Sequence, residues 1–470
     1  MKAALIQLPH FYGGSHSRPP ECYPLGLGYL SARLSQAGVP HEGVNLWAAQ
    51  LPAAEALATV DLSAFDILGI SAYSTQYRYL KEFSLGLKKK YPDKLIVCGG
   101  PGPTFSYEII LRHTGVDICV IGEGENTFLE LASSGKPPAE IPGIAYRSGD
   151  KICVTAPREY IKDLDSIPFP NRKLFDFGAV MQAANAVRAG STVPGAPKAL
   201  RRSADIIAGR GCPYNCNYCS KTFSGCRLRS IGNIMAEIEE IRTQFDIDHL
   251  QFNDELVVLN KERTLEFCRQ IKRFGLKWSC QGRIDRVDRE VLEAMKDAGC
   301  EDIGYGVESV TQSILDRMNK NLKVEKVLPV IKMTREIGIN PVIQYMFGYP
   351  GENDATIDAT VRFFKEIDHH FVGFSTTPIP GAELYRSCLE KGIIRDEEDY
   401  LLRLDSGYNV SGMIINLTDF PDKDFVFKKR MLLLRIMHHH LKRKPFKYAC
   451  FFLGIAFSKA RSLVSRIVRT

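Results

Sequence analysis

Short apolar segments alternate with amphipathic segments along most of this 470-residue chain, and this alternation limits its fold more than any other feature. In the first series, three of the four apolar segments are followed by residues with helical periodicity. Strands followed by helices predict a parallel sheet, because parallel neighbours need a long crossover that packs on the sheet. We therefore expect residues 1–140 to form a doubly wound, Rossmann-like α/β domain, with strands at residues 2–7, 66–71, 94–100 and 117–122.

A second series of strands and helices follows a connecting segment at residues 141–203. The connector begins with a predicted β-hairpin around Ser148, Gly149 and Asp150. Its later part, rich in Ala, Gly and Pro up to Ala199, predicts a mobile loop beside the active site. Residues 204–395 then predict a partial (β/α)6 barrel whose site lies at the carboxyl ends of the strands. The six strand segments are residues 204–211, 247–255, 277–285, 300–309, 340–352 and 371–381.

A cysteine triplet follows the first strand of this second series. Cys212, Cys216 and Cys219 form a C-x3-C-x2-C pattern, which offers fewer thiolates than the four ligands of a closed structural zinc site. Cys226 alone does not complete a zinc knuckle, which needs a second pair of ligands. Three thiolates suit a four-iron four-sulfur cluster in which the fourth iron stays open to a ligand. The triplet therefore predicts a cluster with an open iron.

Composition places the chain among ordinary globular proteins, with 45% hydrophobic and 24% charged residues. The amino terminus lacks the long apolar region of a signal peptide, and the 13 cysteines are scattered apart from the triplet. A disulfide framework is therefore not indicated, and we expect a reducing, cytoplasmic location.

The positive net charge of +7 comes from the basic tail of the carboxyl-terminal region 396–470, a region predicted to be helical. Residues 425–470 carry twelve Lys or Arg and no acidic residue, so the rest of the chain has a net charge of 7 − 12 = −5. A basic amphipathic tail favours peripheral contact with the inner face of a membrane, and packing on the barrel is the alternative. Nucleic-acid binding is the least favoured partner. The apolar run at residues 446–457 is too short to span a bilayer.

The triplet, with Tyr218 before its third cysteine, resembles the signature of the radical SAM enzymes. The resemblance implies that the open iron binds S-adenosylmethionine (SAM), which is then split into methionine and a 5′-deoxyadenosyl radical. It also implies SAM-binding residues at the ends of the barrel strands: Tyr218, Asn253, Asp254, Glu255, Arg283, Gly304, Gly306, Glu308, Gly348 and Pro350. Among these, Arg283 is expected to pair with the SAM carboxylate, and Gly348 and Pro350 to shape the turn beneath the adenine.

The amino-terminal domain resembles the cobalamin-binding domain that precedes the barrel in one radical SAM subfamily. Residues 24–30, the Gly99-Gly100-Pro101 turn and residues 122–125 carry the likeness. It implies cobalamin contacts at Pro24, Leu25, Gly26, Ser71, Tyr73, Gly99, Gly100, Gly122 and Glu123. The D-x-H-x-x-G motif is absent, so the resemblance implies cobalamin without a protein histidine on its lower face. A domain that binds nothing, or a second cluster on Cys22, Cys98 and Cys119, are the alternatives.

Together these resemblances imply cobalamin-dependent methylation of an unactivated carbon in an organic substrate. The expected partners are that unknown substrate, hydrophobic or natural-product-like, and an electron donor such as flavodoxin or ferredoxin. A radical SAM cyclisation, rearrangement or oxidation on the same architecture is one alternative. A non-catalytic sensor that uses cobalamin or the cluster is the other.

Overall fold

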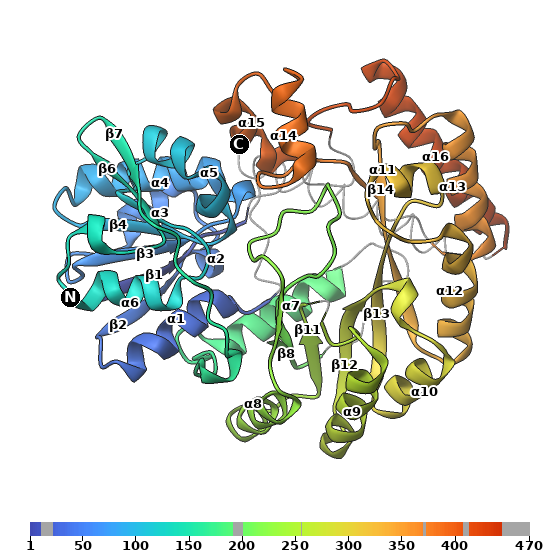
Figure 1. Ribbon diagram of the computed structural model, residues 1–470, viewed down its shortest axis with the longest axis horizontal. Helices are drawn as coiled ribbons and strands as arrows, with labels where there is room; N and C mark the ends of the chain where they lie inside the picture. The colour runs from blue at the N-terminus through green and yellow to red at the C-terminus, as the bar shows by residue number, and fades with distance from the viewer. Residues whose placement is uncertain (11–21, 191–200, 255, 370–372, 408–412, 444–470) are drawn as a thin grey trace, which may run out of the picture.

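The computed structural model describes all residues except 11–21, 191–200, 255, 370–372, 408–412 and 444–470. The amino-terminal half contains a seven-stranded sheet with the order β2-β1-β3-β4-β5-β6-β7 (Figure 1). The first five of these pair in parallel, and β6 and β7 add an antiparallel hairpin at the β5 edge. The strands are β1 (Ala3–Gln7), β2 (His41–Asn45), β3 (Ile67–Ser71), β4 (Leu95–Gly99), β5 (Ile118–Val120), β6 (Ile144–Ser148) and β7 (Lys151–Val154).

Helices cover both faces of this sheet, as the strand–helix alternation predicts. The helices are α1 (Leu25–Gln36) and α6 (Glu125–Ser133) on one face, and α3 (Ala53–Thr59), α4 (Tyr77–Lys90) and α5 (Pro101–His113) on the other. Alternate residues of β1 enter different cores, because successive side chains of a strand point to opposite faces: Leu5 packs with Leu27 and Phe128, and Ile6 with Phe83. The strand order turns back between β1 and β3, which is where ligands bind on such sheets.

Three features of this half differ from the sequence expectation. The predicted hairpin is present, but it pairs with β5, so it extends the amino-terminal sheet and is not an isolated part of the connector. Strand β2 was not expected, because its sequence HEGVN is polar and half-exposed at a sheet edge. The Ala-rich stretch expected as a loop contains α7 (Phe177–Gly190), while the rest of that prediction, residues 191–199, lies outside the described residues.

The second half is an open parallel barrel with the strand order β15-β14-β13-β12-β11-β8, which confirms the predicted six-stranded series. Its strands are β8 (Ser203–Ile206), β11 (His249–Phe252), β12 (Lys277–Gly282), β13 (Cys300–Glu308), β14 (Asn340–Phe347) and β15 (Gly373–Ser375). Helices α8 (Ile231–Gln244), α9 (Lys261–Ile271), α10 (Arg289–Asp297), α12 (Val327–Glu336) and α13 (Asp354–Glu366) surround its outer face (Figure 1).

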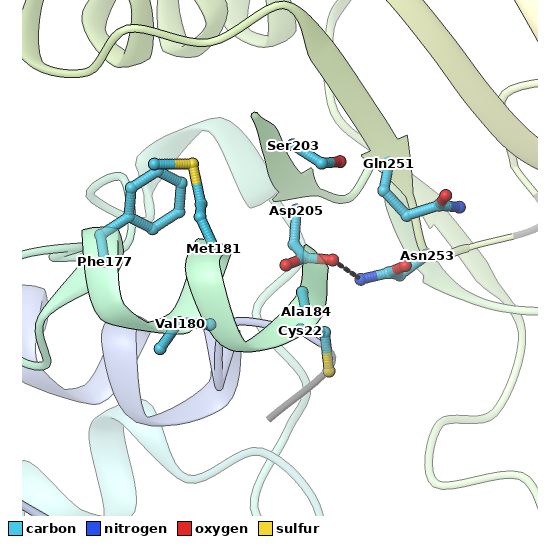
Figure 2. A pocket seen from close by; sticks show the side chains of 9 residues that line it. All are labelled: Cys22, Phe177, Val180, Met181, Ala184, Ser203, Asp205, Gln251 and Asn253. Atoms are coloured by element: carbon cyan, nitrogen blue, oxygen red, sulfur yellow. Dashed lines mark hydrogen bonds between the residues drawn. The ribbon is translucent and has the colours of Figure 1, made fainter. Parts of the chain in front are cut away.

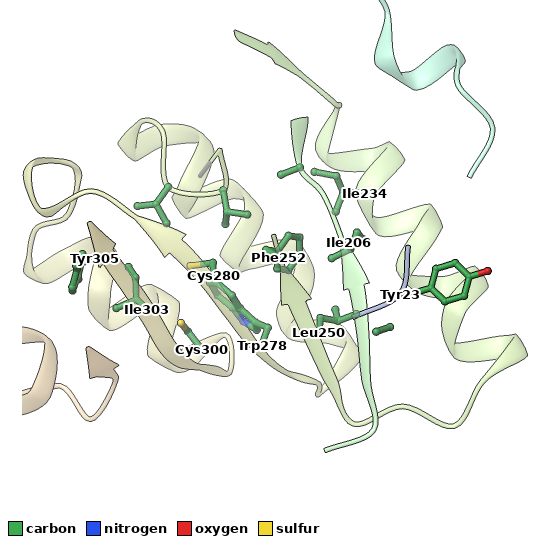
Figure 3. Close-up of a cluster of buried hydrophobic side chains, with 14 of the residues drawn as sticks. Tyr23, Ile206, Ile234, Leu250, Phe252, Trp278, Cys280, Cys300, Ile303 and Tyr305 are labelled. Atoms are coloured by element: carbon green, nitrogen blue, oxygen red, sulfur yellow. The ribbon is translucent and has the colours of Figure 1, made fainter. Parts of the chain in front are cut away.

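Side chains on the outer face of the barrel form its main core (Figure 3). Trp278 is fully buried there and meets Phe252 and Phe267 edge-to-face, with ring centroids 6.1 and 5.4 Å apart. The inner face is different, because it carries polar residues such as Gln281 and Gln344, which hydrogen-bond to each other at 3.0 Å. A barrel with an apolar exterior and a polar interior is suited to hold a polar ligand.

The last helices of the described residues are α14 (Glu383–Glu390), α15 (Glu397–Gly407) and α16 (Asp422–Arg443), of which α16 is the predicted basic helix. It packs along α13, with Phe425, Leu432 and Ile436 buried in the barrel core. Arg435 of α16 also pairs with Asp358 of α13 at 2.6 Å. This apolar face is therefore used in packing and is not available for the membrane contact that the sequence favoured.

A second set of apolar side chains on α16 is exposed, namely Phe427, Met431 and Leu434. The remaining part of the predicted basic tail, residues 444–470, lies outside the described residues, as does its apolar run. Within the described ranges, no helix combines the length and the apolar character needed to cross a membrane.

Candidate functional site at the junction of the two domains

The three cysteines lie on a loop carried by a short ribbon at the mouth of the barrel. Strand β9 (Gly209–Gly211) follows β8 and pairs antiparallel with β10 (Cys226–Leu228). The loop between them begins at Cys212, and the Cys219 backbone N–H donates to the Cys216 carbonyl at 3.2 Å. All three thiols are free of disulfides, and Cys219 is the exposed one. The ribbon therefore presents the thiols at the carboxyl end of β8.

Asn217, between the second and third cysteines, fixes this loop to the barrel. Its backbone N–H donates to the Met318 carbonyl at 3.1 Å, and its Nδ2 donates to the Arg317 carbonyl at 2.6 Å. Its Oδ1 accepts a hydrogen bond from the Tyr349 hydroxyl at 2.6 Å, and its carbonyl accepts one from the Leu384 backbone at 2.8 Å. Backbone and side chain are both satisfied, so the loop geometry is set before any ligand binds. The sequence gave no signal for this role.

Tyr218, Glu308 and Lys320 meet next to the cysteines. The Lys320 Nζ donates to the Tyr218 hydroxyl at 3.0 Å and lies 3.5 Å from the Glu308 carboxylate. Gly306 leaves room for this contact, because a Cβ there would stand 2.8 Å from Glu308 Oε1 and 3.0 Å from Lys320 Nζ. Burial and the Glu308 charge both raise the pKa of Tyr218.

Glu308 has a backbone conformation that non-glycine residues rarely adopt, with φ of 63°. It follows Gly306 at a point where the register between β13 and β14 shifts. Such strain costs of order 1–3 kcal/mol and concentrates at functional sites. The strained backbone lowers the stability of the fold, but it directs the Glu308 carboxylate into the barrel mouth, beside Tyr218.

Arg283, expected to pair with the SAM carboxylate, is engaged elsewhere. Its guanidinium donates to Asp285 at 2.9 Å and to the Lys320 carbonyl at 3.0 Å. It also stacks on the Tyr214 ring, 3.7 Å from the ring centroid, and Tyr214 belongs to the cysteine loop. Through these contacts Arg283 stabilises the position of the cysteine loop.

Gly348 and Pro350 form a turn at the end of β14, as predicted. The Gly348 end of this turn packs against a side chain of α16, whereas the adenine of SAM was expected next to the turn. Gly348 has φ of +87°, and a Cβ there would collide with the Phe425 ring of α16. Its backbone N–H donates to the buried Glu352 carboxyl, whose pKa is raised to about 7 by burial. The turn presents Tyr349 to Asn217, so it supports the cysteine loop from below. Gly304 lies inside the barrel, where a Cβ would meet the Gln281 amide.

Asn253 and Asp254 follow β11 at the barrel mouth. The Asn253 Nδ2 donates to Asp205 at 2.8 Å. The Asp254 carboxylate accepts hydrogen bonds from the backbone N–H groups of Ala208 and Leu256, and burial raises its pKa to about 6. Glu255, predicted as a third residue of this group, lies outside the described residues.

A cavity of about 630 Å³ lies where the amino-terminal sheet faces the barrel. The predicted cobalamin residues all line it: Pro24, Leu25, Gly26, Ser71, Tyr73, Gly99, Gly100, Gly122 and Glu123. Asn253 and Asp254 of the predicted SAM site line the same cavity. Further lining residues that the sequence did not indicate include His10, Cys22, Trp47, Arg210 and Phe223. The cavity therefore joins the two predicted sites.

Part of the cavity lining is apolar and comes from β3, β4, β5 and α6, through Gly69, Val97, Val120 and Phe128. Glycine is needed at two points around it. A Cβ at Gly69 would collide with Phe128, and Gly100 has φ of +101° with its Cβ position 3.0 Å from the Ala72 carbonyl. Glycine, aliphatic and aromatic residues in this lining suit the flat, largely apolar ring system of a macrocycle, so the residues present fit cobalamin.

Glu123 lines the cavity, but its carboxylate is occupied by the cysteine ribbon. It pairs with Arg210 at 2.8 Å and with Arg227 at 2.9 Å, and it accepts a hydrogen bond from the Ile161 backbone at 2.7 Å. Arg210 also pairs with Glu125 at 2.5 Å, and these groups are almost fully buried. Because Arg210 stands two residues before Cys212, this ion cluster fastens the amino-terminal domain to the cysteine loop.

A smaller cavity of about 250 Å³ adjoins the large one, and Cys22 and Asn253 line both. One wall comes from α7 through Phe177, Val180, Met181 and Ala184 (Figure 2). The opposite wall is polar and comes from Ser203, Asp205, Gln251 and Asn253 of β8, β11 and the residue that follows β11 (Figure 2). The cavity could receive a molecule with an apolar part and a hydrogen-bonding part.

Two other groups of metal-binding residue types do not form sites. His249, Glu301 and Asp302 come together, but Arg201 already contacts all three at 2.8–3.1 Å. The alternative second cluster is also not supported. Cys98 and Cys119 are opposite each other inside the sheet core, with no exposed surface, whereas Cys22 lies in the cavities at the barrel mouth.

Comparisons with known proteins agree with this architecture. Residues 206–364 match the radical SAM superfamily, and residues 15–132 match the B12 binding domain. The chain is a radical SAM enzyme with an amino-terminal B12-binding domain. The family confirms the fold class and the three expected cofactors, a four-iron four-sulfur cluster, SAM and cobalamin.

Curated relatives cover most of the chain at low identity. One, from Pyrococcus horikoshii and named "Uncharacterized methyltransferase PH0819", is 27% identical over 79% of this chain and 79% of its own length. Another, from Cereibacter sphaeroides, is named "Anaerobic magnesium-protoporphyrin IX monomethyl ester cyclase" and is 25% identical over 83% of this chain and 64% of its own.

A solved structure shares the overall fold. The radical SAM methyltransferase TsrM from Kitasatospora setae, determined with cobalamin and a [4Fe-4S] cluster bound, superposes with a TM-score of 0.63. The match covers 84% of this chain and 78% of that protein at 18% sequence identity.

Proposed function

We propose that this enzyme transfers a methyl group from SAM to an unactivated carbon of an organic substrate, with cobalamin as the methyl carrier. One observation carries the proposal: the cavity lined by the predicted cobalamin residues is also lined by Asn253 and Asp254 at the barrel mouth. A cofactor held by the amino-terminal sheet would therefore face the SAM site directly. The methyltransferase names of several relatives support this reading.

The loop cysteines Cys212, Cys216 and Cys219 would hold the cluster, and the residues around the barrel mouth would hold SAM. When bound, the cluster supplies the electron that splits SAM, and cobalamin supplies the methyl group. The exposure of Cys219 would leave one edge of the cluster open to a donor such as flavodoxin or ferredoxin. Such a cluster also requires the reducing compartment that the cysteine usage indicates.

Around the barrel mouth, each polar group can take one part of SAM. Asp254 and Glu308 are acceptors suited to the ammonium group and the ribose hydroxyls. Lys320 is the cation that we assign to the SAM carboxylate in place of Arg283, because its ammonium group lies beside Tyr218 and Glu308. Gly304 and Gly306 leave room for the Gln281 amide and for the Glu308 and Lys320 groups to lie against β13, from where these groups would face SAM. The smaller cavity beside Asn253 would receive the substrate.

Product analysis under anaerobic conditions tests this proposal. The full-length protein, with its cluster reconstituted and cobalamin added, is reduced and incubated with SAM. We expect two products, 5′-deoxyadenosine and S-adenosylhomocysteine, because radical formation consumes one SAM and methyl donation consumes another. Formation of S-adenosylhomocysteine should require cobalamin, and its absence in the loaded, reduced protein would contradict methyl transfer.

A cyclisation, rearrangement or oxidation is the second candidate, favoured by the relative named as a cyclase. It predicts 5′-deoxyadenosine without S-adenosylhomocysteine in the same assay. A non-catalytic sensor predicts neither product. The presence or absence of these two products therefore separates the three candidate functions without knowledge of the substrate.

A further inference from the structure

His10 lies three residues after β1, at the carboxyl edge of the amino-terminal sheet, and lines the large cavity. Two aromatic rings flank its imidazole: the Trp47 ring centroid is 4.7 Å away and the Tyr73 centroid 5.5 Å away. Trp47 comes from α2 (Leu46–Ala49), after β2, and Tyr73 follows β3. Three neighbouring strands thus converge to place one imidazole at the point where the strand order turns back.

The large cavity has two opposite walls. The sheet edge contributes Gln7, His10, Trp47, Ser71 and Tyr73, and the barrel side contributes Arg210, Phe223, Asn253 and Asp254. A flat macrocycle lying between the walls turns one face to each. Among the described residues that line the cavity, His10 is the single histidine, so it offers the sheet side an imidazole nitrogen, a common ligand of transition metals.

The protonation state of His10 suits metal binding. Burial lowers the pKa of His10 to about 4, so the ring is neutral in the physiological range. A metal binds the deprotonated nitrogen of an imidazole, and here no proton has to be displaced. The rings of Trp47 and Tyr73 restrict the orientation of the imidazole, which lowers the entropy lost on binding.

We propose that His10 binds the cobalt of cobalamin from the sheet side, as its lower axial ligand. The proposal rests on the proposed function, which puts cobalamin in this cavity. It differs from what the family resemblance implies, namely cobalamin without a protein histidine on that face. The absence of a D-x-H-x-x-G motif does not exclude a histidine ligand here, because the loops after three neighbouring strands place His10 in the cavity without that motif.

Electron paramagnetic resonance of cobalt(II) reports the axial ligand directly. The full-length protein is loaded with hydroxocobalamin, reduced to the cobalt(II) form, and compared with protein grown on ¹⁵N-labelled histidine. We expect each cobalt line to be split into a triplet by a ¹⁴N nucleus and into a doublet in the labelled protein. This comparison uses the unchanged sequence, so it does not depend on how a variant folds.

Two variants assign the nitrogen to one residue. In His10→Gln the splitting should disappear, whereas His113→Gln, at the exposed end of α5, should keep it. Three results would each overturn the inference. The first is unsplit cobalt lines in the wild-type protein, and the second is a triplet that remains a triplet in the ¹⁵N-histidine-labelled protein. The third is a doublet that is still present in labelled His10→Gln. A protein that binds no cobalamin would instead contradict the proposed function on which the inference rests.

Discussion

Single side chains beneath the cysteine loop hold it in position, and the sequence of the loop does not indicate this role. Asn217 connects the loop to three segments of the barrel, and Tyr349 reaches it from the turn after β14. That turn is held in place by Glu352, whose buried carboxyl accepts a hydrogen bond from the Gly348 backbone N–H. The cluster site therefore depends on a carboxyl group that is costly to ionise.

Glu352→Gln should remove a pH dependence of stability. The pKa of Glu352 is raised from 4.5 to about 7 in the folded protein, so the folded state binds this proton more tightly than the unfolded state. The unfolding free energy should consequently fall as pH rises from about 4.5 through 7, by about 3 kcal/mol in total. Urea unfolding of the cluster-free protein at pH 5 and pH 8 measures the difference.

A matched control for this prediction is Glu239→Gln, on the exposed face of α8. Glu239→Gln should retain the wild-type loss of stability between pH 5 and pH 8, and Glu352→Gln should lose most of it. Equal pH dependence in Glu352→Gln and the wild type would show that the buried carboxyl is not the cause.

At the scale of elements, the ribbon β9–β10 is the part that both domains share. It carries the cysteine loop at one end, and its Arg210 and Arg227 pair with Glu123 and Glu125 of the β5–α6 turn. Breaking a buried ion cluster leaves unpaired charge behind, which costs far more than breaking a surface pair. The ribbon should therefore be stabilised by the amino-terminal domain.

Arg210→Met should lower the unfolding free energy by roughly 3–5 kcal/mol, because buried Glu125 loses its ion-pair partner and buried Glu123 loses one of its two. Arg202→Met is the control: Arg202 pairs with Asp246, but both side chains are at least half exposed, and its loss should cost less than about 1 kcal/mol. Thermal unfolding of the three proteins makes the comparison. Similar small shifts in both variants would mean that the buried cluster does not join the domains.

Helix α16 allows a second test at this scale, since it carries buried and exposed leucines two positions apart. Leu432 is fully buried in the barrel core and Leu434 is 47% exposed. Leu432→Ala should cost roughly 2–5 kcal/mol of stability, and Leu434→Ala less than about 0.5 kcal/mol. Equal effects in chemical denaturation would argue that α16 does not pack on the barrel.

For the whole molecule, the sequence predicted the architecture well because most strands of both sheets are parallel and buried. Such strands are continuous apolar runs, and these runs indicated four strands of the first sheet and all six of the barrel. The antiparallel strands β6 and β7 were expected from their hairpin turn. Strand β2 was not predicted, because its sequence HEGVN is polar and it lies at a sheet edge. Helix α7 was not predicted, because its Gly and Ala content suggested a loop. Ala is the strongest helix former, so its frequency here could have indicated a helix.

The site was predictable where topology alone decides it. Glycine-rich turns that follow parallel strands must meet at one edge of a sheet, and those predicted for cobalamin all line one cavity. Side-chain direction was not predictable: Arg283 turns to Asp285, and Gly348 faces Phe425. His10, Asn217 and Lys320 are isolated polar residues without a motif, so only the folded chain brings them to the site.

Radical chemistry in this enzyme depends on whether the three loop cysteines hold a cluster that cleaves SAM. The most direct measurement is the rate of 5′-deoxyadenosine formation by the reconstituted, dithionite-reduced protein, compared between wild type and Cys216→Ala. Cys226→Ala serves as the control, because Cys226 lies on β10, outside the triplet. We expect 5′-deoxyadenosine from the wild type and Cys226→Ala, and none above background from Cys216→Ala. An unchanged rate in Cys216→Ala, or no 5′-deoxyadenosine from the wild type, would contradict this expectation.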